Sequence, residues 1–72
     1  MEQEQQYEEG NLPKNLAKPA VRALAGKGIL RLEQVAECKV SELLALHGMG
    51  PKAVEQLRIA LNEQGLAFLD ET

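Results

Sequence analysis

The stretch ALHGMGPKAVEQL near the middle of the chain contains the residue types best suited to bind an anion. Gly48 can adopt a positive φ angle at little steric cost and so end an incoming helix sharply. Gly50 lacks a Cβ, which lets another backbone approach the turn, and Met49 is expected to point inward as an apolar plug. Pro51 suits the first position of a new helix, where the first N–H groups have no intrahelical acceptor. Those amides, the positive helix end and the charge of Lys52 together predict a phosphate site.

No other chemistry has comparable support in the composition. Cys38 and His47 are the only cysteine and histidine, so an intramolecular disulfide is impossible and a structural zinc site lacks ligands. No Ser–His–Asp set, metal cluster or paired-carboxylate cleft is recognisable, and no cofactor is expected. Cys38 is expected to be a small packing residue, and His47 to face solvent at a helix end. The sequence therefore predicts a binding module and not an enzyme.

A chain of 72 residues can form one small domain, and its core must be aliphatic because it has one phenylalanine, one tyrosine and no tryptophan. We expect a net stability of about 5 kcal/mol or less. Leucine- and alanine-rich sequence with few β-branched residues favours an all-α fold. Neither a membrane-spanning apolar run nor a secretory signal is recognisable, so no membrane partner and a cytoplasmic location are expected.

The formal net charge of −3 is unevenly distributed along the chain. Residues 1–9 contain four glutamates and no basic residue, and Asp70 and Glu71 add two negative charges near the other end. Residues 10–69 contain all eight basic residues and five glutamates, a net charge of +3. A mildly basic centre is compatible with a polyanionic partner.

The apolar pattern predicts four helices separated by glycine turns. Pro19 opens the first helix, and Gly26 and Gly28 end it. A short second helix closes near Glu37, and the third begins with Ser41 as its N-cap unless the boundary lies one or two residues earlier. The residues expected on the buried faces of these three helices are Ala20, Val21, Leu24, Ala25, Ile29, Leu32, Val35, Leu43, Leu44 and Leu46.

The last and longest helix is expected to begin at Pro51 and to end before Gly65, which suits a C′ position. Leu66 and Phe68 are then expected to fold back onto the core. The apolar spacing of this helix is formed by Val54, Leu57, either Arg58 or Ile59, and Leu61.

An internal repeat accompanies these turns. ALAGKG around Gly26 has the same Ala-Leu-x-Gly-x-Gly pattern as ALHGMG around Gly48, and a Glu-Gln pair follows each at the same offset. A single repetition is too short for a solenoid, which needs about three units. The repeat favours two similar helix–turn–helix units packed face to face. The Gly26–Gly28 turn is expected to be mainly structural, with Lys27 as a secondary contact for the same partner.

The segment LHGMGPKAVEQL resembles the helix-hairpin-helix motif, in which an apolar residue precedes Gly-apolar-Gly and a helix with a basic residue follows. From about Leu12 to Phe68 the chain is similar to the helix-hairpin-helix domain at the C-terminus of the RNA polymerase α subunit. GILRLEQVA, ELLALHGMG and ALNEQGLAF carry this similarity. The resemblance implies a compact four- to five-helix, SAM-like domain of two helix-hairpin-helix units over residues 12–69. An acidic, disordered tail over 1–11 and a frayed end over 70–72 would flank it.

The resemblance also implies that hairpin amides and the following basic residue grip the duplex DNA backbone on the minor-groove side. Arg22 lies near the position where the polymerase domain presents polar groups to the groove. Pro19 stands in place of an arginine of that domain, which argues against a preference for A·T-rich sites. The candidate nucleic-acid-binding residues are Gly48, Met49, Gly50, Pro51, Lys52, Ala53, Arg22 and Lys27.

Two functions remain open at this point. The first is a module that binds duplex DNA through its phosphates, largely without sequence preference, in transcription or DNA repair. The second is a protein-interaction adaptor in the same machinery that uses the fold as a scaffold. Glycosylases with this motif carry a catalytic aspartate downstream of the hairpin, and Asp70 is suitably distant. The chain has too few aromatic residues to stack a flipped base, so we do not expect catalysis or a small-molecule substrate.

Overall fold

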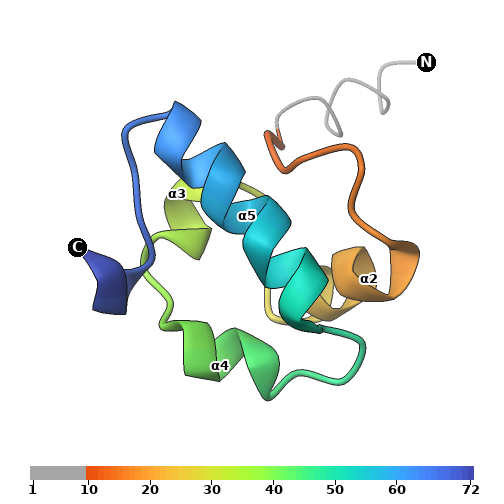
Figure 1. The fold of residues 1–72 in the computed structure, drawn as a ribbon. Coiled ribbons are helices and arrows are strands. Elements are labelled where there is room, and N and C mark those ends of the chain that lie inside the picture. Colours follow the sequence, from red (N-terminus) through yellow and green to blue (C-terminus); the bar gives the residue numbers. More distant parts are fainter. Residues whose placement is uncertain (1–9) are drawn as a thin grey trace.

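The computed structural model describes residues 10–72 and is all-helical over that range, as the sequence predicts. Helix α5 crosses the centre of the molecule, and the shorter helices lie around it (Figure 1). Residues 1–9 of the expected acidic tail lie outside the described residues. None of the described helices has the length and hydropathy needed to cross a membrane. In chain order, the elements are α2 (Lys18–Gly26), α3 (Leu32–Val35), α4 (Val40–Leu44), α5 (Pro51–Glu63) and the 3-10 turn η1 (Leu69–Glu71).

Glycines terminate both long helices in the same way. After α5, Gly65 has a φ of 74°, its N–H donates to the carbonyl of Asn62, and the N–H of Leu66 donates to that of Leu61. After α2, Gly28 has a φ of 79°, its N–H donates to the carbonyl of Ala25, and the N–H of Ile29 donates to that of Leu24. These are Schellman caps, which use the left-handed conformation that glycine adopts without a Cβ penalty. The prediction that Gly65 ends α5 is confirmed.

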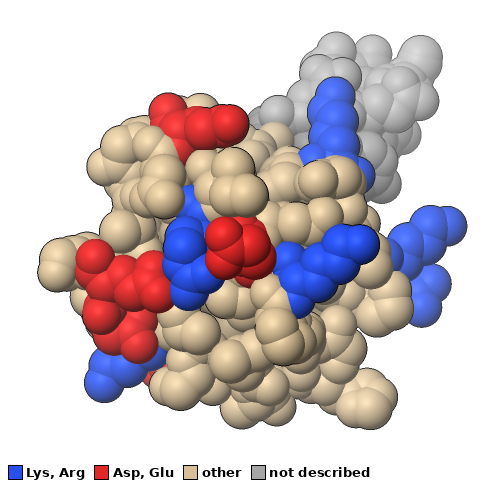
Figure 2. All heavy atoms as spheres, viewed as in Figure 1, with Lys and Arg blue, Asp and Glu red and all other residues tan. Residues whose placement is uncertain are grey.

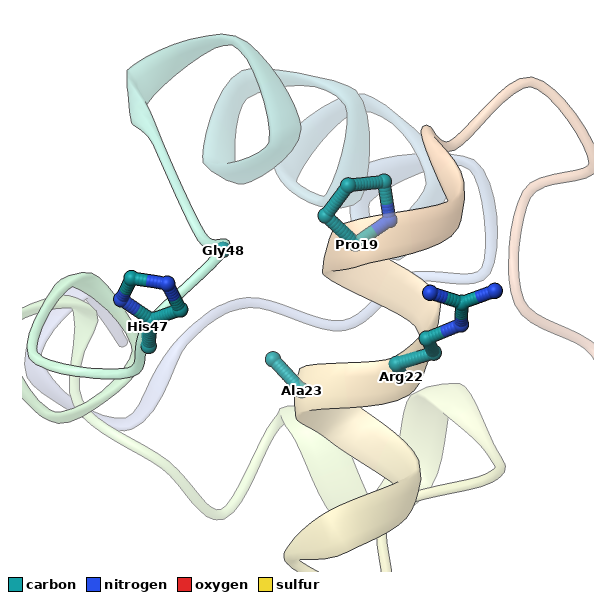
Figure 3. A pocket seen from close by; sticks show the side chains of 5 residues that line it. All are labelled: Pro19, Arg22, Ala23, His47 and Gly48. Atoms are coloured by element: carbon teal, nitrogen blue, oxygen red, sulfur yellow. The ribbon is translucent and has the colours of Figure 1, made fainter.

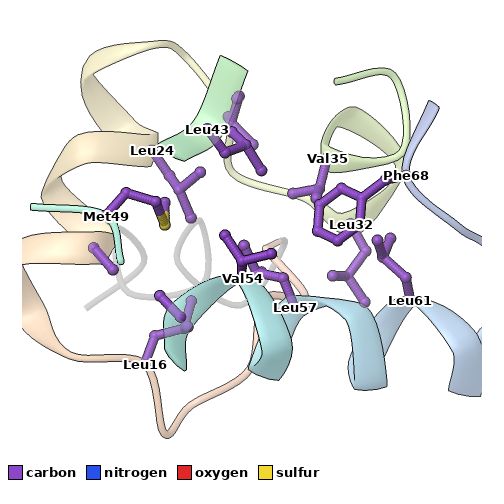
Figure 4. Packing of buried hydrophobic residues seen from close by; sticks show 13 residues of the cluster. Leu16, Leu24, Leu32, Val35, Leu43, Met49, Val54, Leu57, Leu61 and Phe68 are labelled. Carbon is purple, nitrogen blue, oxygen red and sulfur yellow. The ribbon is translucent and has the colours of Figure 1, made fainter. Parts of the chain in front are cut away.

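The core is a single aliphatic cluster completed by one aromatic ring (Figure 4). Leu16, Leu24 and Met49 form one end of the cluster beside the start of α5, and Leu61 and Phe68 lie at the other end. Phe68 is fully buried, which confirms that the chain folds back after α5. The remaining buried members are Ala20, Ile29, Leu32, Val35, Leu43, Ala53, Val54 and Leu57.

Several residues expected in the core lie on the surface instead. Leu44 is 44% exposed and Val21 is 41% exposed, and Ala25 is exposed as well. Ile59 is 52% exposed, so Arg58 and Ile59 both lie off the buried stripe of α5. The shortness of α4 explains the error at Leu44, because this single turn presents only one residue, Leu43, to the core.

Side-chain hydrogen bonds fix the start of α3, with Asn11 contributing from outside the helix and Gln34 from within it. The N–H of Leu32, at the start of α3, donates to Oδ1 of Asn11 at 2.6 Å. Gln34 accepts from the N–H groups of Leu30 and Arg31 at 2.7 and 2.9 Å and donates to the carbonyl of Gly28. Asn11 was expected in the tail but is tied to α3. Helix α4 begins at Val40 with Lys39 as its N-cap, so Ser41 is not the cap.

The end of the chain is attached to the domain, although residues 70–72 were expected to fray. The N–H of Leu69 donates to the carbonyl of Cys38, and Oδ1 of Asp70 accepts from the N–H of Val40. Glu71 accepts two hydrogen bonds from Arg58, at 3.0 Å from Nε and 2.8 Å from Nη2. The Arg58 guanidinium also lies 5.6 Å from the centre of the Phe68 ring. These contacts hold η1 across α5 and the α3–α4 connection.

The Arg58–Glu71 contact predicts an acid-sensitive contribution to stability. The hydrogen bonds from Arg58 lower the pKa of Glu71 below its ordinary value of 4.5. Because the folded state holds this proton less tightly than the unfolded chain, the stabilisation is complete above pH 4.5 and is lost as the pH falls through the lowered pKa. We expect Glu71→Gln to reduce the free energy of unfolding at neutral pH and to flatten its decline in acid.

Urea denaturation of both proteins at neutral pH and at about pH 3 measures this difference. Glu63→Gln is the matched control, because Glu63 is exposed and makes no ion pair with another described residue. An acid profile of Glu71→Gln that superimposes on that of the unmodified protein would contradict the prediction.

Candidate nucleic-acid interface

The hairpin between α4 and α5 is built on one glycine that no other residue can replace without strain. Gly48 has a φ of 94°, and a Cβ added there would lie 2.9 Å from the carbonyl oxygen of Pro19 in α2. Met49 is 7% exposed and packs into the core, which confirms its role as a plug. Gly48 therefore sets both the turn and the close approach of the hairpin to α2.

The second glycine of the turn faces open space. Gly50 is the N-cap of α5 in an extended conformation, and a Cβ at this position would meet nothing within 4 Å. Pro51 occupies the first turn of α5, as expected. The surface above Gly50 is thus accessible to another backbone, as predicted from the sequence.

The first amides of α5 have no acceptor in the described part of the chain. The N–H of Val54 donates to the carbonyl of Gly50 at 3.1 Å, whereas those of Gly50, Lys52 and Ala53 donate to no described residue. No side chain caps the helix, and its first turn contains no acidic residue. α5 has 13 residues, so its N-terminus carries a developed positive dipole end. Donors and field together can hold an oxyanion at this point.

Several basic side chains lie near the hairpin. In the face shown in Figure 2, basic side chains lie over α2 and the start of α5, acidic side chains lie over the C-terminal segment, and the middle of α5 carries an acidic group between two basic ones. Lys52 is exposed at the second position of α5, and Lys14 and Lys18 are exposed before and at the start of α2. Within residues 10–72, ion pairs involve only the arginines at 31 and 58. Lys14, Lys18 and Lys52 thus make no ion pair with another described residue.

The Gly26–Gly28 turn, by contrast, does not form a second hairpin of this kind. The N–H groups of Lys27, Gly28 and Ile29 all donate to carbonyls of α2 at 2.9–3.0 Å, because this segment is a helix C-cap. Its positive φ is at the second glycine, whereas the positive φ of the hairpin is at the first. Lys27 lies at the opposite end of α2 from Pro19, which touches the hairpin. The structure does not bring Lys27 to the other candidate residues.

Arg22, in contrast, is brought to the hairpin. A shallow hollow of about 300 Å³ lies beside the contact between α2 and the hairpin, and Figure 3 shows the five residues that line it. His47 lies on the hairpin side of this hollow and Arg22 lies on α2, with its guanidinium directed away from His47. Both are exposed, and neither side chain bonds to another described residue. Pro19, Ala23 and Gly48 form the surface between them.

The structure reveals a repeat that the sequence analysis missed. KPAVRAL at the start of α2 matches PKAVEQL at the start of α5. Ala20 and Ala53 are both buried at equivalent positions, and so are Leu24 and Leu57. Each long helix also begins with a proline in its first turn and ends in a glycine Schellman cap. The shared spacing Ala-Val-x-x-Leu was visible in the sequence, but the more conspicuous Gly-x-Gly echo obscured it.

Helix α4, the hairpin at residues 48–50 and helix α5 define an all-α helix-hairpin-helix domain. A family model described as the SAM-like helix-hairpin-helix tandem matches residues 19–63. The match covers more than half of the chain, and the chain belongs to this family. No curated protein and no solved structure matches the chain. Among residues 10–72, no group of His, Cys, Asp or Glu side chains is suited to hold a metal ion.

Proposed function

We propose that the protein is a non-catalytic module that binds duplex DNA through its sugar–phosphate backbone on the minor-groove side. The single observation that carries this proposal is the set of amides at Gly50, Lys52 and Ala53, which have no acceptor among the described residues at an uncapped helix start. The family commonly binds nucleic acids, which supports the same reading. In this arrangement the amides and Lys52 hold one phosphate, and Lys14, Lys18 and Arg22 add attraction for its neighbours.

Recognition of this kind carries little sequence information, because phosphates are the same at every base pair. The resemblance to the C-terminal domain of the RNA polymerase α subunit supports a role in transcription or DNA repair. Pro19 stands where that domain has an arginine, so we propose no preference for narrow A·T-rich grooves. With few phosphates neutralised, binding is weak and falls steeply as salt increases.

The experiment compares Lys52, which follows the hairpin, with Lys27, which lies within the Gly26–Gly28 turn. We expect Lys52→Glu to weaken binding to a fluorescently labelled duplex about tenfold or more at low salt, because it places a negative charge beside the phosphate. Lys27→Glu changes the net charge equally but lies beside amides that are already occupied, so we expect a loss of about threefold or less. Fluorescence anisotropy measures both dissociation constants.

Equal losses of affinity for the two variants would indicate that only general charge attraction holds the duplex. Such a result would contradict a specific hairpin site. If the unmodified protein does not bind the duplex at low salt, the DNA-binding proposal fails and the fold serves only as a scaffold. A protein partner recovered after nuclease treatment would then identify it as an adaptor.

A further inference from the structure

We infer that only the second of the two glycine turns in the tandem binds phosphate, so that the protein holds a DNA duplex by one of its two strands. This inference rests on the proposed function and names the part of the duplex that the site receives. A tandem contains two turns, and the internal repeat makes the Gly26–Gly28 turn the counterpart of the Gly48–Gly50 hairpin. The two turns differ in whether their backbone donors are open to an anion.

The repeat gives each donor of the hairpin a counterpart in the first turn. In the register of the Ala-Leu-x-Gly-x-Gly pattern, Leu32 corresponds to Val54. Val35 corresponds in the same way to Leu57, and all four side chains are buried. The packing therefore keeps this register beyond both turns. The counterparts of Gly50, Lys52 and Ala53 are Gly28, Leu30 and Arg31.

Each of these counterpart amides already has an acceptor within the protein. The N–H of Gly28 donates to the carbonyl of Ala25 at 2.9 Å. The N–H groups of Leu30 and Arg31 donate to Oε1 of Gln34 at 2.7 and 2.9 Å. A phosphate oxygen can bind there only by displacing a hydrogen bond within the protein, whereas the hairpin amides have no described acceptor to lose.

The helix after the first turn also provides little attraction for an anion. α3 has four residues, whereas α5 has 13 and a developed positive end. The N–H of Leu32, the first residue of α3, is bonded to Oδ1 of Asn11 at 2.6 Å. Glu33 is exposed in the same turn, and its carboxylate repels a phosphate. One set of fixed backbone donors is therefore open, and one set of donors binds one strand.

Methylphosphonate linkages carry no charge, so either strand of a labelled duplex can be made neutral to test this inference. We expect the full-length protein to bind a duplex with one neutral strand within about threefold of the unmodified duplex, because the native strand remains available. Neutralising both strands should weaken binding by about tenfold or more. Fluorescence anisotropy at low salt measures each dissociation constant. A loss from one neutral strand that equals the loss from two would overturn the inference.

A lysine placed in the first turn provides a second test. Leu30 is 57% exposed and is the counterpart of Lys52. We expect Leu30→Lys to raise the affinity for duplex about threefold or less, because the amides beside it are occupied and only general charge attraction is added. Leu69→Lys is the matched control, since it adds the same charge at an exposed residue of η1. A gain of about tenfold for Leu30→Lys alone would show that the first turn also binds phosphate.

The inference can fail while the proposed function holds. In that case Lys52→Glu binds more weakly than Lys27→Glu, but neutralising one strand costs as much affinity as neutralising both. If the unmodified protein does not bind duplex DNA, the proposed function and the inference fail together. The melting temperature of Leu30→Lys is expected to stay unchanged, because the side chain is exposed.

Discussion

Gly48→Ala is expected to remove most of the stability of the domain. The φ of 94° costs about 1–3 kcal/mol for a residue with a Cβ, and that Cβ would also meet the carbonyl oxygen of Pro19 at 2.9 Å. The contact is with backbone, so relief requires the hairpin to move away from α2. A domain of this size has about 3–5 kcal/mol available in total. Thermal denaturation followed by circular dichroism should show a melting temperature reduced by about 10 °C or more.

Gly26→Ala is the matched control for this prediction. Gly26 occupies the position of Gly48 in the Ala-Leu-x-Gly-x-Gly echo, but it is the last residue of α2 and has no positive φ. A Cβ there meets nothing within 4 Å, so alanine should leave the stability unchanged or raise it by about 0.5–1 kcal/mol. Similar melting temperatures for the two variants would contradict the structure of the hairpin.

Phe68→Ala is expected to unfold the protein or nearly so. The ring is fully buried between α3 and α5 and is covered by the Arg58 guanidinium. Replacing a buried phenylalanine with alanine typically costs about 3–5 kcal/mol, which equals the total stability expected for the domain. The far-ultraviolet circular dichroism signal at room temperature should fall accordingly.

Phe68→Leu separates loss of packing from loss of the C-terminal contacts. Leucine fills most of the same space, so its cost should stay below about 1.5 kcal/mol and the helical signal should persist. An alanine variant as stable as the leucine variant would show that Phe68 does not close the core.

The sequence predicted those features that depend on local backbone chemistry. Pro51 begins α5, Gly65 ends it, and Met49 plugs the turn, because each of these outcomes follows from the residue and its immediate neighbours. The bare amides beside Lys52 belong to the same group. The all-α class was likewise evident from composition and spacing.

Features that depend on distant contacts could not be predicted in the same way. Asn11 accepts a hydrogen bond from the N–H of Leu32, and no local pattern indicates which helix a distant asparagine will cap. Leu44 was assigned to the core from its spacing, but α4 is too short for a second buried position. The hollow beside His47 arises only when α2 packs against the hairpin.

Residues that stabilise the domain lie outside the segment that matches the family model. Leu16 and Asn11 precede residues 19–63, and Phe68 and Glu71 follow them. A fragment trimmed to the family limits would keep the hairpin and lose both ends of its hydrophobic packing. A fusion protein that includes this domain should therefore carry it from Asn11 through Glu71.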